Sequence, residues 1–388
     1  MKARSAGRSH NGRVNLDAAA PQLGGLSPAQ FMRRHWQRKP LLVRAAWPRL
    51  EPLLTRTQLF ALAADGDAES RLVQHNGSHW NVRHGPLPRR SLPPLRQPGW
   101  TLLVQGVDLF VEGAHRLLQS FRFVPDARLD DLMISYASDG GGVGPHVDAY
   151  DVFLLQLHGR RRWRIGRVRD DRLVDGAPLK LLRRFEPSDD WLLEPGDLLY
   201  LPPHWGHDGV AVGECMTASI GFRAPRADEL ARTLMFGVAD GAGDAVEPGA
   251  YYGDRASAPT TRPGSIPPSL QAFARTAWQR ATRDPRVIER ALGQWLSEPK
   301  AHVWFEAGAP SRSLGSRELV LDRRTRLLYD AHHAYINGES SPLAARDAQW
   351  LRRLADDRAL SASDVRRLGT SARALVQQWL AAGWIHER

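Results

Sequence analysis

The segment from Leu132 to Phe222 constrains the fold most, because it alternates short apolar runs with turn residues. Gly, Pro and Asp separate the runs, which cover residues 132–137, 150–157, 161–165, 191–193, 198–201 and 216–222. Several short strands with turn signals between them favour a β-sandwich or jelly roll over a parallel α/β fold. The sequence Glu-Pro-Gly-Asp at 194–197 predicts a tight turn between two of these strands.

The regions on either side of this segment are predicted to be more helical. Before it, Ser27 as N-cap and Pro28 at the first helical position predict a helix. A short strand follows Pro40, and further elements are predicted at 71–74 (β), 100–104 (β) and 109–121 (helix). After it we expect helices at 228–236, 268–282, 284–297, 344–355, 361–368 and 371–382. A β pair, 318–321 with 327–329, is expected through the turn 322–325.

These elements predict a mainly β protein with added helices, in four parts. The parts are a disordered basic tail (1–22), a β domain (23–225), a helical segment (226–297) and a winged-helix-like domain (298–388). In the helical segment, apolar residues at helical spacing leave one face uncovered, and these are Leu270, Phe273, Ala277, Val287, Ala291 and Trp295. We expect this face to form a homodimer contact; the alternative is packing against the β domain.

Composition narrows the class of protein. With 42% apolar residues and 13 Trp, the chain is expected to fold. No apolar run reaches about 18 residues and no signal-peptide core begins the chain, so neither a membrane span nor secretion is expected. A single Cys, Cys215, fits a reducing compartment, and the cytoplasm is the expectation. Residues 1–50 hold ten Lys or Arg against one acid, Asp17. Such a basic arm suits a nucleic-acid-rich partner such as an RNA–protein particle, or is a solubilising tail.

Three residues inside the β segment have the composition of a metal site. His146 and Asp148 are two positions apart, so on a strand both point to the same face. His207 follows on a later strand of the same sheet system, with His204 as a competing third ligand. Two imidazoles and one carboxylate are the ligand set of a non-haem Fe(II) site with open coordination positions. An iron of this kind can hold a bidentate cosubstrate together with dioxygen, which makes an oxygenase the leading hypothesis.

Arg161 is the second element of the predicted site. If its side chain faces the barrel, it is a buried guanidinium that needs a partner. The carboxylate of a cosubstrate would pair with it in bidentate geometry. The alternative is that Arg160, Arg161 and Arg162 together form an exposed basic rim.

The stretches 133–163, 200–209 and 219–225 resemble the bacterial JmjC-domain ribosomal oxygenases, which hydroxylate an arginine of ribosomal protein uL16. The resemblance continues through Tyr-Tyr-Gly-Asp at 251–254 and the run at 319–338, and so covers nearly the whole chain after residue 23. It implies a double-stranded β-helix (a jelly-roll JmjC core), then a helical dimerisation segment and a winged-helix-like C-terminal domain. It also implies a ribosomal protein as substrate.

The resemblance assigns roles to individual residues. The iron ligands would be His146, Asp148 and His207, and Arg161 would hold the far carboxylate of 2-oxoglutarate. Relatives carry a small polar residue at the position of Ala137, so Ser135 on the same face is the expected substitute. Just past the triad, Tyr150 and Asp151 are candidates for recognising a cationic substrate side chain, or else Tyr150 packs and Asp151 caps a turn.

Three alternatives stay open. The first is the same chemistry on a histidyl or lysyl substrate. The second is a cupin-type metal enzyme without 2-oxoglutarate, which would not need Arg161. The third is a non-catalytic module that binds RNA or the ribosome. Acids at Asp347, Asp356, Asp357 and Asp364 weaken the case for phosphate binding by the C-terminal domain, where we expect an interaction or structural role.

Overall fold

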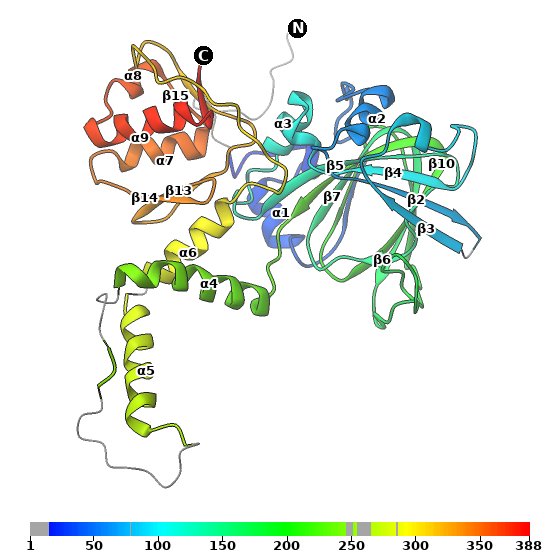
Figure 1. Ribbon diagram of the computed structural model, residues 1–388. Coiled ribbons are helices and arrows are strands. Elements are labelled where there is room, and N and C mark those ends of the chain that lie inside the picture. The colour runs from blue at the N-terminus through cyan, green and yellow to red at the C-terminus, as the bar shows by residue number, and fades with distance from the viewer. Residues whose placement is uncertain (1–14, 78, 246–250, 254–264, 285) are drawn as a thin grey trace. The chain divides into compact units, whose positions relative to one another are not determined.

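The computed structural model describes residues 15–77, 79–245, 251–253, 265–284 and 286–388 and divides into two compact units (Figure 1). The first unit runs to Ala224 and includes Ala301–Trp304; the second holds Pro225–Lys300 and Phe305–Arg388. The predicted tail, 1–22, lies mostly outside the described residues. Of its last residues, Pro21 begins a short 3-10 helix, η1 (Pro21–Leu23). No helix within the described ranges is long and apolar enough to cross a membrane.

The first unit is built on a ten-stranded antiparallel sheet that confirms the predicted jelly-roll core (Figure 1). Its strand order is β1-β9-β7-β10-β5-β4-β2-β3, with β6 beside β10 and β8 beside β7. The strands are β1 (Leu41–Val43), β2 (Ser70–Asn76), β3 (His79–His84), β4 (Trp100–Val104), β5 (Leu129–Ala137), β6 (His146–Val147), β7 (Val152–Arg167), β8 (Asp189–Leu193), β9 (Leu198–Leu201) and β10 (Trp205–Phe222).

Two of these strands are much longer than the sequence suggested. The predicted strands 150–157 and 161–165 form one bent strand, β7, which begins at Val152, and 216–222 is the last part of β10. The bend of β7 lies at Gly159, whose φ is +60°. A Cβ at this position would lie 2.1 Å from the Glu214 carbonyl oxygen, so only glycine fits. Beyond the bend, Arg161 of the second half lies within hydrogen-bond distance of Ser135 and Thr217.

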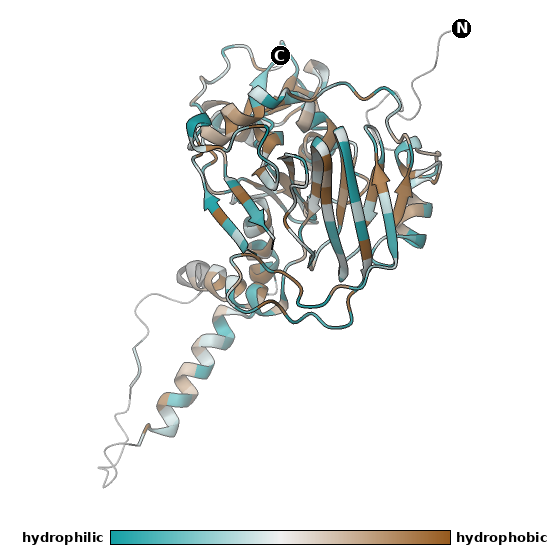
Figure 2. Cartoon of the chain, turned by 90° about the vertical axis from the view of Figure 1, so that its right-hand side faces the viewer, coloured by the Kyte–Doolittle hydropathy of each residue, from teal (hydrophilic) through white to brown (hydrophobic). Residues whose placement is uncertain are grey.

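Side chains along the second half of β7 alternate between the barrel interior and solvent, as the period of a strand requires. Arg161, Trp163 and Ile165 are buried, while Arg162 and Arg164 between them are exposed. Figure 2 shows hydrophobic and hydrophilic bands interleaved along the strands of the sheet. This result excludes the predicted alternative in which Arg161 lies on an exposed basic rim.

Short helices pack on the outer face of the sheet and complete its hydrophobic core. They are α1 (Pro28–Arg34), α2 (Arg56–Ala64), η2 (Arg89–Ser91), η3 (Val107–Leu109) and α3 (Glu112–Gln119). The predicted N-cap is present, because the Ser27 hydroxyl accepts from the Gln30 N–H in a capping box. Phe31 of α1 packs edge-on against Tyr200 and beside Phe153. Each such fully buried aromatic side chain contributes about 2 kcal/mol or more by removal from water.

The second unit begins with three helices, α4 (Ala227–Ala245), α5 (Pro268–Ala281) and α6 (Arg286–Ser297). The apolar face expected along α5 and α6 is covered on one helix and partly exposed on the other. On α6, Ala291 is buried and Gly293 lies against the Tyr335 ring, so this helix packs within its own unit. On α5, Leu270 and Phe273 remain 37% and 38% exposed. Part of the predicted face on α6 is therefore covered by the helix's own unit and not by the β domain, while Leu270 and Phe273 on α5 stay partly exposed.

The rest of the second unit combines two three-stranded sheets with three helices, in agreement with the predicted winged-helix-like domain. The helices are α7 (Ala348–Asp357), α8 (Ala362–Val365) and α9 (Thr370–Ala381). One sheet has the order β15-β11-β16 and the other β12-β13-β14. The strands are β11 (Leu319–Leu321), β12 (Leu327–Tyr329), β13 (His333–Ile336), β14 (Glu339–Pro342), β15 (Ala359–Leu360) and β16 (Ile385–Glu387).

One prediction for this domain is wrong. The expected β pair of 318–321 with 327–329 does not form, because β11 pairs with β15 and β16 while β12 pairs with β13. The predicted turn does form, since the Thr325 N–H donates to the Asp322 carbonyl, but the Asp322 N–H donates to the Trp384 carbonyl and its side chain faces His386. Asp322 is thus tied to the segment of β16, and β12 pairs elsewhere.

Candidate metal centre

The three predicted metal ligands are brought together by the pairing of β6 with the start of β10. In this register His146 lies directly opposite His207, and Asp148 follows β6 by one residue. Backbone hydrogen bonds hold both ends of the short strand. The Leu182 N–H donates to the Pro145 carbonyl, and the His204 N–H donates to the Asp148 carbonyl. The ligands thus sit on a segment that is anchored on both sides.

The glycine-rich run before His146 is needed for close approach of the backbone. A Cβ on Gly142 would lie 2.7 Å from the Gly209 carbonyl oxygen of β10. Gly144 has a φ of +75°, a conformation that other residues rarely adopt. Gly209 also has to be a glycine, because a Cβ there would lie 2.6 Å from the Trp163 ring. The glycines of both motifs therefore let the ligand-bearing segments pack tightly on each other.

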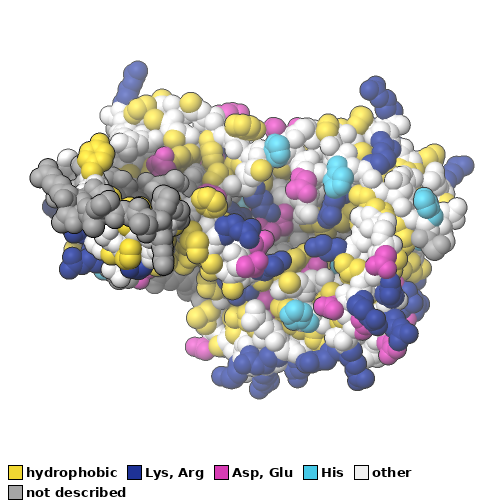
Figure 3. Space-filling model, turned by 60° about the horizontal axis from the view of Figure 1, so that its bottom comes forward, with side chains coloured by type: hydrophobic (Ala, Val, Ile, Leu, Met, Phe, Trp, Pro, Cys, Tyr) yellow, Lys and Arg dark blue, Asp and Glu magenta, His cyan; other side chains and the backbone are white. Residues whose placement is uncertain are grey.

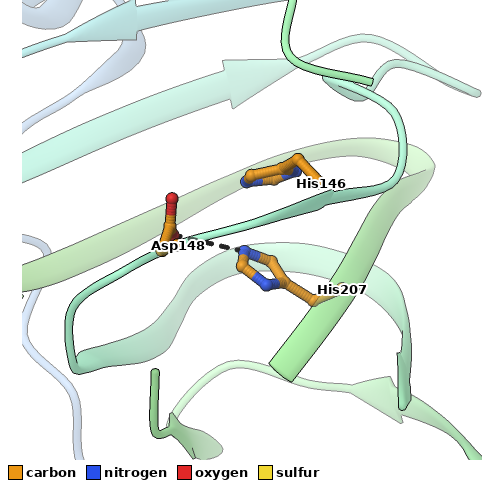
Figure 4. A group of neighbouring side chains, drawn as sticks. All are labelled: His146, Asp148 and His207. Carbon is orange, nitrogen blue, oxygen red and sulfur yellow. Dashed lines mark ion pairs between the residues drawn. The ribbon is translucent and has the colours of Figure 1, made fainter. Parts of the chain in front are cut away.

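The side chains of His146, Asp148 and His207 converge on one point (Figure 4). One potential ligand atom from each lies within 4.8 Å of the others. His207 Nε2 is 3.6 Å from Asp148 Oδ2, and the two imidazole centroids are 4.2 Å apart. Two nitrogens and one oxygen at this separation can occupy one face of an octahedral metal ion and leave the opposite face open.

Backbone carbonyls orient both imidazoles for metal binding. His146 Nδ1 lies 2.9 Å from the Gly144 carbonyl oxygen, and His207 Nδ1 lies 3.0 Å from that of Trp205. Because a carbonyl can only accept, Nδ1 carries the proton in each ring and Nε2 presents its lone pair. Burial, followed by the neighbouring His146, lowers the pKa of His207 to about 4. The neutral form that a metal requires is therefore favoured.

His204, the competing third ligand, does not belong to this group. Its backbone has a φ of +65° in the turn before β10, and its side chain is exposed. Among the described residues, the cluster able to hold a metal ion consists of His146, Asp148 and His207.

Arg161 lies inside the barrel and is only 4% exposed. Its Nη1 donates to the hydroxyls of Ser135, at 3.0 Å, and Thr217, at 3.3 Å. Its Nε is buried without a hydrogen-bond partner, and the hydrogen bonds that its guanidinium forms in the described structure go to these neutral hydroxyls. A buried guanidinium with only neutral partners is costly. The site therefore fits a ligand that brings an anionic group to Arg161.

Ala137 lies two positions after Ser135 on β5, close to this guanidinium. Ala137 packs with Ala211 and Cys215, all small and buried. The neighbouring strand β4 contributes Thr101, paired in register with Ala137, whose buried hydroxyl has no hydrogen-bond partner in the described structure. Ser135, the expected substitute for the polar residue of relatives, contacts Arg161 directly. The hydroxyls of Ser135 and Thr101 suit the carboxylate end of a small dicarboxylate.

The structure separates the two candidate substrate residues. Tyr150 is 40% exposed, and partial burial together with the Asp148 carboxylate raises its pKa, so it stays a neutral phenol beside the ligand set. Asp151 is fully buried. Its carboxylate accepts from the Tyr200 hydroxyl at 2.6 Å and the Gln37 amide at 3.1 Å, and lies 3.5 Å from Arg128. Asp151 is thus committed to the core and is not available to a substrate.

Sequence reasoning missed several residues of the interior. Thr217 and Gln156 lie directly beside the Arg161 hydrogen bonds, and Trp163 stands between Arg161 and His207. Thr217 and Gln156 interrupt apolar strands with a polar side chain, which is a signal for an inward-facing polar group. That signal went unused because the inward face depends on the register.

The face of the molecule in Figure 3 carries many Lys and Arg side chains, but Asp and Glu are interspersed among them. Two arginines of the outward row on β7 show this mixing, since Arg162 pairs with Asp190 and Arg164 with Asp208. Such paired surface charges offer little free positive potential to a nucleic acid.

Comparison with known proteins adds independent findings. Residues 116–230 match the JmjC domain family, and residues 277–386 match the ROXA-like winged helix family. The chain is 36% identical over 271 residues to the ribosomal protein uL16 3-hydroxylase of Escherichia coli K12, covering 70% of this chain and 71% of that protein. It is 35% identical over 210 residues to a probable ribosomal oxygenase of Haemophilus influenzae, covering 53% of this chain and 52% of that protein.

Solved structures agree along nearly the whole chain. The X-ray structure of E. coli ycfD superimposes with a TM-score of 0.78 at 32% identity, covering 94% of this chain and 98% of that one. A second structure of YcfD, a ribosomal oxygenase, was solved in complex with cobalt and 2-oxoglutarate. It matches with a TM-score of 0.73 at 32% identity, covering 93% of this chain and 98% of that one.

Proposed function

Since the chain belongs to the bacterial JmjC-domain ribosomal oxygenases, we propose that it is an Fe(II)- and 2-oxoglutarate-dependent oxygenase that hydroxylates an arginine side chain of ribosomal protein uL16. The observation that carries the proposal is the pairing of a three-ligand cluster with a buried guanidinium that lacks an anionic partner in the described structure. A cupin-type enzyme without 2-oxoglutarate would have no use for Arg161 in this position.

The chain's own residues have defined parts in this chemistry. His146, Asp148 and His207 would hold the Fe(II), and Arg161 with Ser135 would bind the far carboxylate of 2-oxoglutarate. When bound, Fe(II) and 2-oxoglutarate would activate dioxygen, which is the oxidant: one of its oxygen atoms enters succinate as 2-oxoglutarate is oxidised with release of carbon dioxide, and the other enters the hydroxyl group. The apolar residues around Trp163 exclude water from this interior.

Recognition of the substrate is assigned to uL16 through the named activity of the E. coli relative. A neutral Tyr150 beside Asp148 offers a phenol ring and a nearby negative charge, which suits a cationic side chain. The same environment would accept a histidyl or lysyl side chain less well, because neither offers a planar guanidinium for stacking.

The direct experiment uses the purified full chain with Fe(II), 2-oxoglutarate and a uL16 fragment, followed by tandem mass spectrometry. We expect one added oxygen atom on an arginine. A fragment in which each arginine is replaced by lysine serves as the matched substrate control and should stay unmodified. Modification of a histidine or lysine, or conversion that continues without 2-oxoglutarate, would contradict the proposal.

We also propose that the chain forms a homodimer through the helices of the second unit, with the part boundaries at 225 and 297 as expected from the sequence. Large apolar side chains remain exposed on these helices, which is unusual for a surface that stays in water. They are Met235 (60% exposed), Phe236 (68%), Leu270 (37%), Phe273 (38%), Trp278 (56%) and Ile288 (44%).

Light scattering after size exclusion tests the dimer. Phe273→Asp should shift the full chain from dimer to monomer at micromolar concentration, because it places a charge in the apolar face. Ala272→Asp, an exposed position on the opposite side of the same helix, is the matched control and should leave the dimer intact. A wild-type chain that elutes as a monomer would refute this proposal.

A further inference from the structure

Four polar side chains form a continuous hydrogen-bonded row on the inner face of the barrel. In register, Thr217 of β10 lies opposite Ser135 of β5 on one side and opposite Gln156 of β7 on the other. Arg161, from the second half of β7 beyond the bend, donates to Ser135 and Thr217. All four residues are at most 4% exposed. The row is therefore isolated from solvent, and each hydrogen bond has to be satisfied within it.

The bend in β7 determines how the Gln156 amide is oriented. Its Nε2 donates to the carbonyl oxygens of His158, at 2.9 Å, and Gly159, at 3.3 Å. Because carbonyls cannot donate, the amide nitrogen has to face them, and Oε1 has to face Thr217. Gln156 thus links the backbone of the β7 bend, through its amide nitrogen, to the Thr217 hydroxyl, through its amide oxygen.

The orientation of the Gln156 amide in turn determines the direction in which the Thr217 hydroxyl donates its proton. Thr217 Oγ1 lies 3.0 Å from Gln156 Oε1, which only accepts, so the hydroxyl proton is donated to Gln156. The remaining lone pairs of Thr217 accept from Arg161 Nη1 at 3.3 Å. Thr217 therefore has no proton left for a ligand and acts as a fixed acceptor that holds the guanidinium.

The hydroxyl of Ser135, unlike that of Thr217, has no strong acceptor for its own proton in the described structure. It accepts from Arg161 Nη1 at 3.0 Å, while the acceptor for its own proton within the chain, the Thr217 carbonyl oxygen, is 3.5 Å away. A contact of this length is at the limit of a hydrogen bond. Ser135 can therefore give its proton to a carboxylate beside Arg161 at little cost, whereas Thr217 cannot.

We propose that Gln156 is a positioning residue for the cosubstrate: through Thr217 it holds Arg161 against Ser135, and it makes Ser135 the hydroxyl that donates to the far carboxylate. This inference rests on the proposed function, in which the ligand is 2-oxoglutarate. Gln156 acts through Thr217 and has no contact with the ligand itself. Its effect therefore depends on the presence of the Thr217 hydroxyl, and that dependence can be measured.

Calorimetry on the full chain loaded with Mn(II), a redox-inert substitute for iron, provides the test. The probes are 2-oxoglutarate and 2-oxopentanoate, which keeps the 2-oxoacid end but has a methyl group in place of the far carboxylate. Ser135→Ala should weaken 2-oxoglutarate binding by about ten-fold or more, the loss of a hydrogen bond to a charged group. Thr217→Val and Gln156→Met should each weaken it by about three- to ten-fold. None of these variants should change the affinity for 2-oxopentanoate.

A double variant distinguishes positioning from general stabilisation. Because Gln156 acts through Thr217, the Gln156→Met/Thr217→Val chain should bind 2-oxoglutarate no more weakly than the weaker of the two single variants. Thr217→Ser keeps the hydroxyl and should bind like the wild type. Additive losses, equal losses for both probes, or unchanged affinity in the single variants would overturn the inference.

Binding and turnover separate this inference from the proposed function. A wild-type chain that binds 2-oxoglutarate but leaves uL16 unmodified would contradict the proposed function, and the variant series would still decide the role of Gln156. A wild-type chain that does not bind 2-oxoglutarate would overturn both.

Discussion

Replacement of Arg161 by methionine should change ligand binding and stability in opposite directions. The guanidinium is buried and is bound only by the neutral hydroxyls of Ser135 and Thr217 among the described residues. In the ligand-free protein it is a buried cation without a counter-charge, so removing it relieves a desolvation cost. With 2-oxoglutarate bound, the same cation is the main partner of a carboxylate.

The expected magnitudes follow from these contacts. Both hydroxyls keep a second hydrogen bond in the variant, Ser135 to the Thr217 carbonyl and Thr217 to Gln156, so neither is left unsatisfied. Replacing a buried charge by an apolar group of similar volume is neutral or stabilising by about 1–4 kcal/mol. Losing two hydrogen bonds to a charged carboxylate costs about 3 kcal/mol or more, which is at least about a hundredfold in dissociation constant.

Thermal unfolding and calorimetry of the Mn(II)-loaded chain measure both effects. Arg161→Met without ligand should unfold at the wild-type temperature or above, and adding 2-oxoglutarate should no longer raise that temperature. The control is Arg162→Met, one residue along β7, where the exposed pair with Asp190 contributes at most about 1 kcal/mol. A ligand-free Arg161→Met chain that is strongly destabilised, or one that keeps its affinity for 2-oxoglutarate, would refute the reasoning.

Three further predictions concern the metal ligands, the glycine-rich run and the buried acid. His207→Ala should abolish Mn(II) binding measured by calorimetry, whereas His204→Ala should leave it intact; equal losses would contradict the ligand assignment. Gly142→Ala should destabilise the chain by about 1–3 kcal/mol in urea unfolding, because its Cβ meets a carbonyl oxygen, while Gly66→Ala, which has open space, should stay within about 0.5 kcal/mol. Asp151→Ala should lower the unfolding free energy by about 3 kcal/mol while the folded chain keeps its affinity for 2-oxoglutarate; a selective loss of substrate turnover instead would restore Asp151 as a substrate contact.

The interior of the barrel could be predicted from the sequence as far as strand periodicity reaches. A period of two residues brings His146 and Asp148 to one side and sets Arg161 opposite to Arg160 and Arg162, and the structure has both arrangements; which face is the inner one was left open by the sequence. The length of β7 could not be predicted. A glycine such as Gly159 is typical of a turn that ends a strand, but here it bends a strand that continues on both sides. Local sequence does not distinguish these two uses of glycine.

Contacts between distant segments explain the other differences. Asp151 follows the ligand motif and looks accessible, yet its partner Tyr200 comes from a strand 49 residues later. Thr217 is recognisable as important only once its register with Ser135 and Gln156 is known. One local signal was available and unused. Asn337 and Gly338, both with positive φ, form the turn of the β13–β14 hairpin, as Asn-Gly often does.

Incorporation of oxygen from heavy-isotope dioxygen tests the central claim most directly. The chain with Fe(II), 2-oxoglutarate and the uL16 fragment, reacted under labelled dioxygen, should yield an arginine that carries one heavy oxygen atom and an equal amount of labelled succinate. The same mixture with His146→Ala should yield neither. An unlabelled hydroxyl group, or a labelled product formed without succinate, would contradict the assignment of this site as a 2-oxoglutarate oxygenase.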